Sequence, residues 1–236
     1  VQDVDKGFLR TSFGSGANTF VKADPVELDL KGENCNLSNS PGTDTAAYAP
    51  FYEMKSDYGY GDLYELIDVL NNDPDNIEDV LNVDRTLWMH AFNYVLINFD
   101  GYVGYAQNYY LYKDGNGQFN PILWDLNQSF ASYRLTDASD YFNGFTIDQA
   151  KQMDPLLHHN SVSVYPRPLM RNLFKNDRYR KMYLAHIKTI TEENFASGLY
   201  KDRATSLQSA IDASVLADTN KFYSYADFLD NKDKTV

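Results

Sequence analysis

The sequence has a single cysteine, Cys35, in 236 residues. One thiol cannot form an intrachain disulfide, and it also excludes a zinc cluster built from cysteines. No run of about 18 apolar residues occurs, so no segment of this sequence is a candidate membrane-spanning helix. A charged start followed by an apolar core, the pattern of a secretory signal peptide, is also missing from these residues. The chain opens at Val1 in sequence that already resembles a folded domain, and we expect further residues upstream.

Positive charge is scarce as well. Lys and Arg number 21 against 33 Asp and Glu, which gives a formal net charge of -12. A broad basic face for phosphate backbones is therefore excluded, and we expect no nucleic-acid partner. The content of 43% hydrophobic and 23% charged residues is ordinary for a globular chain, and the length suits one sizeable domain or two small ones.

Tyrosine, in contrast, is abundant, with 19 residues against 2 tryptophans. Many of the tyrosines lie between residues 94 and 112. A tyrosine ring packs against apolar groups while its hydroxyl stays solvated. This concentration indicates a cleft or an interface, although strands of the core would have a similar composition.

Periodicity predicts a β-containing start followed by a mostly helical body with one hairpin inserted in its middle. Residues 1–30 carry loosely alternating apolar positions and are predicted to form strands or a hairpin, whereas residues 31–50 are predicted to form a loop. A second hairpin is predicted over 108–127, because Asp114 to Gly117 is a strong turn sequence. Helices are predicted over 62–70, 77–81, 84–98, 168–174, 177–190, 192–199 and 201–215.

The most informative stretch joins the helix predicted over 84–98 to the hairpin. Asp100 follows the helix in a loop, Asn108 begins the next strand, and Asp125 ends the returning strand. Phosphoryl transfer from ATP needs one carboxylate to orient the attacking hydroxyl, and a second carboxylate and an amide oxygen to hold Mg²⁺. An Asp after a helix is more often a turn or cap residue, and spacing alone leaves that alternative open.

These segments resemble the CotH family of spore-coat and secreted kinases. The similarity rests on 98–100 (Asn-Phe-Asp), on 108–112 (Asn-Tyr-Tyr-Leu-Tyr) and on 122–127 (Ile-Leu-Trp-Asp-Leu-Asn). Further similar segments are 5–9, 19–22, 167–183 and 222–228. The resemblance covers most of the chain, and the central hairpin is its most specific part.

The resemblance implies an α+β, protein-kinase-like fold with a partial N-terminal β region. Residues 1–60 would form part of an N-terminal lobe or linker, and residues 61–236 a mostly helical C-terminal lobe that carries the central β-hairpin. It also implies ATP with Mg²⁺ or Mn²⁺, and transfer to a Ser or Thr hydroxyl of a cell-surface or spore-coat protein. The implied location is extracytoplasmic in bacteria, whether secreted, at the cell surface or anchored at the outer membrane.

By the same resemblance, Asp100 orients or deprotonates the acceptor hydroxyl, and Asn108 and Asp125 bind the metal. Asn127 stands where the family usually has a second acid, so as a metal ligand it brings no charge, and metal affinity should fall. Two alternatives stay open. The chain could transfer another group from ATP, such as AMP, or it could be a non-catalytic binding or assembly module of the cell surface on the same fold.

Nucleotide contacts from the N-terminal region are harder to assign. Gly14 and Gly16 are similar to part of a glycine-rich loop that leads to Lys22, but a third glycine is missing and a turn explains the pair better. Lys22 is a candidate nucleotide contact. We expect the phosphate loop and the lysine of a complete kinase upstream of Val1.

Two basic pairs follow the hairpin. His158 and His159 would need a third ligand to hold a metal, and the sequence does not nominate one. Arg167 and Arg171 flank a predicted helix start, where a solvated helix face explains them better than a phosphate contact.

Overall fold

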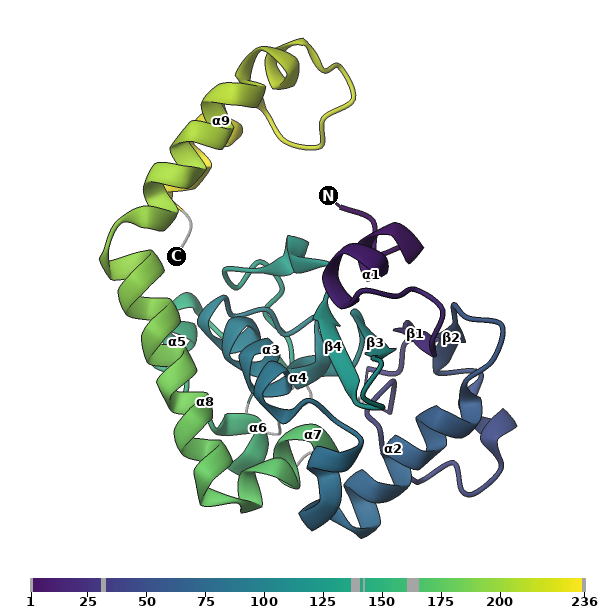
Figure 1. Cartoon of the computed structure of the whole chain (residues 1–236). Helices are drawn as coiled ribbons and strands as arrows, with labels where there is room; N and C mark the ends of the chain where they lie inside the picture. The colour runs from purple at the N-terminus through teal and green to yellow at the C-terminus, as the bar shows by residue number, and fades with distance from the viewer. Residues whose placement is uncertain (1, 31–32, 137–140, 142, 161–165, 235–236) are drawn as a thin grey trace.

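A four-stranded antiparallel sheet lies at the centre of the computed structural model, which describes residues 2–30, 33–136, 141, 143–160 and 166–234 (Figure 1). The strand order is β2-β1-β3-β4. The strands are β1 (Phe20–Ala23), β2 (Tyr52–Met54), β3 (Tyr109–Lys113) and β4 (Phe119–Leu123). The N-terminal strands therefore extend the same sheet as the central hairpin, because β1 pairs directly with β3.

The hairpin predicted over 108–127 is confirmed as β3 and β4. Its turn is closed by a hydrogen bond from the Gly117 amide to the Asp114 carbonyl (3.1 Å), and Gly117 has a φ of 88°. Such a left-handed φ suits glycine, which has no Cβ to clash. Pro121 lies in β4 at the edge of the sheet, where its missing N–H costs no interstrand bond.

The first 30 residues differ from the prediction, because Lys6–Phe13 forms a helix, α1, instead of a strand. The Asp5 side chain accepts a hydrogen bond from the Phe8 amide (2.7 Å) and caps the start of this helix. Gly14, at a φ of 77°, ends it. The first glycine of the pair Gly14 and Gly16 is therefore the C-cap of a helix.

The two faces of the sheet pack against different layers. Val21 and Leu111 point into the main core, which they share with helices α2 (Tyr60–Asn72) and α3 (Val83–Val95). The opposite face is covered by α1 and forms a second, smaller cluster of buried side chains: Leu9, Phe20, Tyr110, Tyr112 and Ile122. The hairpin is therefore held from both sides.

Helices cover the side of the main core that faces away from the sheet, and α8 (Asp177–Ile190) packs along α3 (Figure 1). The observed bounds of α8 match the prediction, whereas α3 ends at Val95, before the predicted Asn98. Shorter elements are η1 (Thr45–Tyr48), η2 (Pro74–Asp79), α4 (Tyr102–Tyr105), η3 (Leu126–Gln128), α5 (Ile147–Lys151), α6 (Leu157–Asn160), α7 (Pro168–Arg171) and η5 (Leu173–Lys175).

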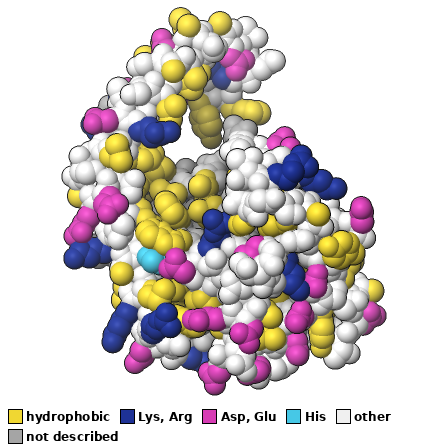
Figure 2. All heavy atoms as spheres, viewed as in Figure 1, with side chains coloured by type: hydrophobic (Ala, Val, Ile, Leu, Met, Phe, Trp, Pro, Cys, Tyr) yellow, Lys and Arg dark blue, Asp and Glu magenta, His cyan; other side chains and the backbone are white. Residues whose placement is uncertain are grey.

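The C-terminal helices form an arm that extends away from this body (Figure 1). It begins at the π-helix η6 (Thr191–Ala196), continues as α9 (Leu199–Ala217), and returns along α9 as α10 (Tyr225–Lys234). Figure 2 shows the hollow between arm and body, with hydrophobic side chains along its wall. No described helix is both long and apolar enough to cross a membrane.

The tyrosines between residues 94 and 112 belong to the core and not to an open cleft, since all of them are buried. Their hydroxyls reach backbone carbonyls: Tyr102 donates to Asn36 (3.0 Å) and Tyr109 donates to Cys35 (2.5 Å). These bonds attach the loop around Cys35 to the hairpin and to the segment that precedes it.

Candidate active site

The segment that leads to Asp100 is tightly folded. After α3 ends, Ile97 takes a left-handed φ of 45°, and the Asn98 amide donates back to the Asn93 carbonyl (2.8 Å). Gly104, in α4, packs directly on this segment, because a Cβ added there would lie 1.8 Å from the Phe99 carbonyl oxygen. Only glycine fits at that position, so the loop around Asp100 has little room to change shape.

Two neighbouring amides converge on the Asp100 carboxylate. Gln107 donates from Nε2 to Oδ1 (2.6 Å), and Asn108 donates from Nδ2 to Oδ2 (3.2 Å) and to the Asp100 backbone carbonyl (2.8 Å). Ala106 and Asn108 both have left-handed backbones, with φ of 54° and 57°. Non-glycine residues in this region are uncommon and concentrate at functional sites.

Asp125 meets this group from the other strand at the same open end of the hairpin, where Tyr109 pairs with Leu123. It follows β4 with a left-handed φ of 51°. Burial raises the pKa of Asp100, the hydrogen bond from Gln107 opposes that rise, and the negative charge of Asp125 adds to it. Within the described part of the chain, the Asp125 carboxylate accepts no hydrogen bond and forms no ion pair. Two acids of like charge thus face one another, and one of them is unpaired.

This donor set fits a divalent cation. Mg²⁺ and Mn²⁺ prefer carboxylate and amide oxygens, and a cation relieves the repulsion between two acids. Asn108 donates its hydrogen bonds to Asp100 from the amide nitrogen, so the Oδ1 of Asn108 is available to a metal. Among the described residues, no three His, Cys, Asp or Glu side chains are arranged to hold a metal, so amide oxygens would have to complete the site.

Asn127 forms no hydrogen bond with Asp100, Asn108 or Asp125. It is exposed on η3 and lines a cavity of about 390 Å³ between η3 and the α9–α10 arm. Tyr200, Gln208 and Lys232 line the same cavity. The structure therefore brings Asp100, Asn108 and Asp125 together, whereas metal binding by Asn127 stays a prediction.

Comparison with known families agrees with the motifs on this hairpin. A family model described as CotH kinase protein matches residues 1–235, essentially the whole chain. The chain belongs to the CotH kinase family. No curated relative matches it. The α+β architecture, with its small antiparallel sheet, is consistent with a kinase-like fold.

Lys22 lies on β1, directly opposite Tyr110 of β3. Its ammonium group pairs with Asp24. The Tyr110 ring meets the ring of Trp124 edge-on, with centroids 5.5 Å apart, and Trp124 precedes Asp125. Lys22 is thus on the sheet face that leads towards Asp125, but it does not contact the two acids, and its role as a nucleotide contact stays a prediction.

Arg167 corrects one sequence expectation, because it is buried and not on a solvated helix face. The side chain is 1% exposed. It donates from Nε to the Tyr102 carbonyl (3.0 Å) and from Nη2 to the Gly104 carbonyl. Arg167 therefore holds α4, which connects Asp100 to Asn108. The only signal in the sequence was the apolar run that follows it, Pro168 to Met170.

His158 is also part of the core. Its ring is hydrogen-bonded to the Tyr94 hydroxyl at Nδ1 and to Thr136 at Nε2 (2.5 Å). Burial, and then the charge of Arg167, lower its pKa to about 3. Both ring nitrogens are engaged, so His158 is a neutral packing residue under Phe99 and not a metal ligand.

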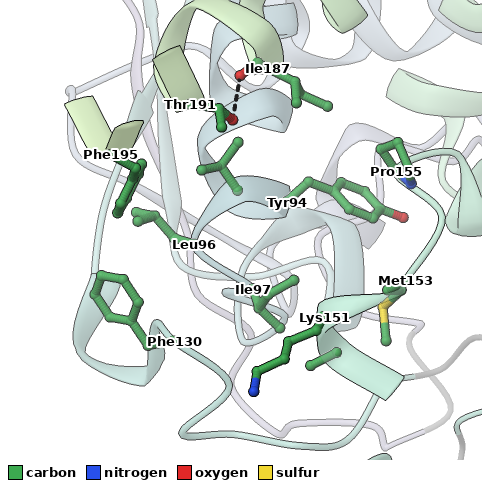
Figure 3. Close-up of a pocket in the computed structure, with 12 residues that line it drawn as sticks. Tyr94, Leu96, Ile97, Phe130, Lys151, Met153, Pro155, Ile187, Thr191 and Phe195 are labelled. Carbon is green, nitrogen blue, oxygen red and sulfur yellow. Dashed lines mark hydrogen bonds between the residues drawn. The ribbon is translucent and has the colours of Figure 1, made fainter. Parts of the chain in front are cut away.

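An apolar cavity of about 390 Å³ lies beside the C-terminal end of α3 (Figure 3). Ile97, Phe130 and Phe195 contribute to its wall, and Lys151 lies on its edge. The Phe130 amide donates to the Leu96 carbonyl (2.5 Å). This bond joins the end of α3 to the segment after Asp125, so both halves of the site share one support.

Proposed function

We propose that this member of the CotH kinase family transfers the γ-phosphoryl group of ATP to a Ser or Thr hydroxyl of a protein. The observation that carries the proposal is the convergence of Asp100, Asn108 and Asp125 at the ends of one hairpin, with left-handed backbones at Asn108 and Asp125. An acid, an amide and a second acid follow one another in this order in protein kinases.

Each side chain has a distinct task in this proposal. Asp100 accepts the proton of the attacking hydroxyl as its oxygen bonds to the γ-phosphorus and the bond to ADP breaks. A raised pKa suits a carboxylate that takes up a proton. Asp125 and the Oδ1 of Asn108 would hold Mg²⁺ or Mn²⁺, which supplies charge neutralisation on the phosphates. We assign Asn127 as a further, uncharged ligand and Lys22 as a nucleotide contact.

We infer from family membership that the acceptor is a protein of the cell or spore surface and that the chain works outside the cytoplasm. Its net charge of -12 argues against nucleic acid as the partner. Extracytoplasmic localisation can be tested by protease accessibility of the tagged protein in intact cells or spores.

The first experiment is calorimetric titration of ATP into the wild type and Asp125→Ala, with and without Mg²⁺ or Mn²⁺. We expect metal-dependent binding in the wild type and none in Asp125→Ala. Binding that is equal in the two proteins would contradict the site assignment. Absence of binding in the wild type would favour a non-catalytic surface module, the alternative that Asn127 supports by standing in place of an acid.

ATP labelled at the α-phosphorus or at the γ-phosphorus then identifies the transferred group. Label at the γ position should reach a Ser/Thr acceptor protein, and label at the α position should not. Transfer of the α label would instead show AMP transfer.

A further inference from the structure

We propose that Gln107 is a positioning residue that keeps Asp100 out of the metal's coordination and so divides the tasks of the two carboxylates. The inference rests on the proposed function, because it assigns a cause to the different roles of Asp100 and Asp125. It concerns a residue that the motifs around Asp100 do not include.

The two acids differ sharply in their hydrogen bonds. Both carboxylate oxygens of Asp100 accept one: Oδ1 from Gln107 at 2.6 Å and Oδ2 from Asn108 at 3.2 Å. The Asp125 carboxylate accepts none from any described residue. An oxygen that already accepts a short hydrogen bond has less electron density to offer a cation, so Asp125 is the better ligand of the two.

Gln107 is held firmly in the place from which it donates. Its side chain is 9% exposed, and its backbone is anchored on both sides. The carbonyl of Ala106 accepts a bond from the Cys35 amide (2.8 Å), and the amide of Asn108 donates to the Ala23 carbonyl (2.9 Å). The Asp100 bond is the single hydrogen bond that its side-chain amide makes among the described residues. A buried amide with one partner keeps that partner.

Removing this donor has a consequence that a packing defect does not have. Without Gln107, Oδ1 of Asp100 becomes a free anionic ligand beside Asp125, and a divalent cation can bind both carboxylates. Metal affinity then rises, while Asp100 is no longer available to the acceptor hydroxyl and transfer falls. Damage to the fold would lower both properties together.

The test titrates wild type, Gln107→Leu and Gln107→Met with Mn²⁺ alone. Binding is measured by electron paramagnetic resonance, which detects the free ion. The matched control is Gln118→Leu, since Gln118 lies in the hairpin turn and donates to the Glu78 carbonyl (2.5 Å). We expect both Gln107 variants to bind Mn²⁺ about fivefold more tightly. This change in affinity corresponds to the net free energy of one typical hydrogen bond. We expect their transfer kcat to fall about tenfold or more, with Gln118→Leu close to wild type in both measurements.

Each outcome decides the inference. Unchanged or weaker Mn²⁺ binding in the folded Gln107 variants overturns it, and thermal melting checks that they are folded. If the wild type binds no Mn²⁺ but Gln107→Leu does, the proposed function is in doubt and the inference holds. If none of the proteins binds Mn²⁺, the inference fails together with the metal site.

Discussion

At the scale of single residues, the candidate site is a place where function opposes stability. Asp100 and Asp125 repel one another, and neither has a cationic partner in the described residues. Neutralising Asp125, whose carboxylate accepts no hydrogen bond from a described residue, should therefore move the midpoint of urea denaturation upwards while it impairs function. Asp125→Asn should lose metal-dependent ATP binding. Asp100→Asn should keep that binding, but its rate of phosphoryl transfer should fall about 100-fold or more, as expected for a residue that acts as a general base.

The matched control for this pair is Asp114→Asn, in the hairpin turn of the same sheet. Asp114 Oδ2 accepts a hydrogen bond from Asn120 Nδ2 (3.0 Å), which the amide nitrogen of an asparagine cannot accept, so the substitution removes a bond near the turn and no repulsion. We expect lower stability and full ATP binding. If Asp125→Asn were also less stable than wild type, the repulsion between the acids would not contribute significantly to stability.

Arg167 illustrates the opposite case, a charged residue whose role is structural. Arg167→Met removes the donors to the carbonyls of Tyr102 and Gly104. The Tyr102 carbonyl keeps its bond from the Ala106 amide (3.2 Å), whereas the Gly104 carbonyl loses its donor in the core. We expect a loss of about 3 kcal/mol or more in the free energy of unfolding, measured with urea. Arg171→Met, on the exposed side of α7, should stay within about 0.5 kcal/mol of wild type. Equal effects of the two substitutions would contradict this role.

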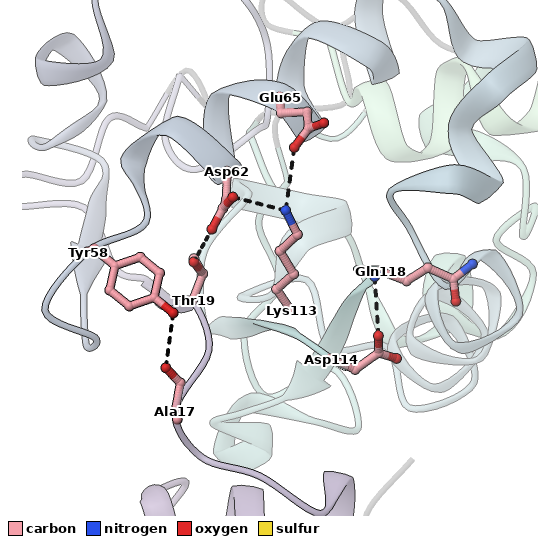
Figure 4. Close-up of polar contacts among 8 residues, drawn as sticks. All are labelled: Ala17, Thr19, Tyr58, Asp62, Glu65, Lys113, Asp114 and Gln118. Atoms are coloured by element: carbon pink, nitrogen blue, oxygen red, sulfur yellow. Dashed lines mark hydrogen bonds and ion pairs between the residues drawn. The ribbon is translucent and has the colours of Figure 1, made fainter. Parts of the chain in front are cut away.

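At the scale of elements, the end of β3 is attached to α2 by a polar cluster (Figure 4). Lys113 pairs with Asp62 (2.9 Å) and Glu65 (3.4 Å), and the Thr19 hydroxyl donates to Asp62. Burial tends to raise the pKa of Asp62, but the bonds from Thr19 and Lys113 outweigh it, and the pKa is lowered. The cluster therefore fixes the hairpin against the first long helix.

We expect Lys113→Met to cost about 1 kcal/mol of unfolding free energy, because the pairs are only partly exposed and share one ammonium group. Lys55→Met is the matched control, since the side chains of Lys55 and Glu53 form a more exposed pair that should contribute little. Urea denaturation of both variants checks the difference. A Lys113→Met protein as stable as Lys55→Met would show that packing alone attaches α2 to the hairpin.

The elements that sequence reasoning identified are those with local signals. The bounds of α8 were predictable because Asn176 caps its start, accepting a bond from the Arg178 amide (2.9 Å). The hairpin was predictable from its turn residues. Helix α1 was missed because it is short and contains Gly7, which is unfavourable in a helix. Its cap at Asp5 was the available signal.

The candidate site was predictable only in part, for a similar reason. Asp100, Asn108 and Asp125 follow from motif and order along the chain. The contacts of Gln107 and Arg167 depend on how α4 folds back on Phe99, and this follows from the room that Gly104 leaves. No local pattern encodes such a contact, because it is set by packing between segments that are far apart in the sequence.

At the scale of the whole molecule, two histidines make the fold sensitive to acid. His90 and His158 are both buried, and burial lowers their pKa values to about 4 and about 3 from the ordinary 6.5. The unfolded chain takes up protons on these rings near pH 6.5, whereas the folded chain takes them up only at much lower pH. Their contribution to stability is therefore fully present above pH 6.5 and is lost as the pH falls towards 4 and then 3.

Each histidine should lower the unfolding free energy by about 1.4 kcal/mol per pH unit in that window. Urea denaturation at several pH values between 7.5 and 4.5 measures the slope. His158→Gln should remove about half of it, whereas His186→Gln, a partly exposed residue beside Asp84, should leave it unchanged. A slope that did not change in His158→Gln would mean that carboxylates, and not buried imidazoles, dominate acid unfolding.

The two acids of the candidate site act in the opposite direction, because protonation of Asp100 relieves its repulsion with Asp125. A Gln107→Leu protein, in which Asp100 lacks the hydrogen bond that opposes the rise of its pKa, should consequently lose less stability on acidification than wild type.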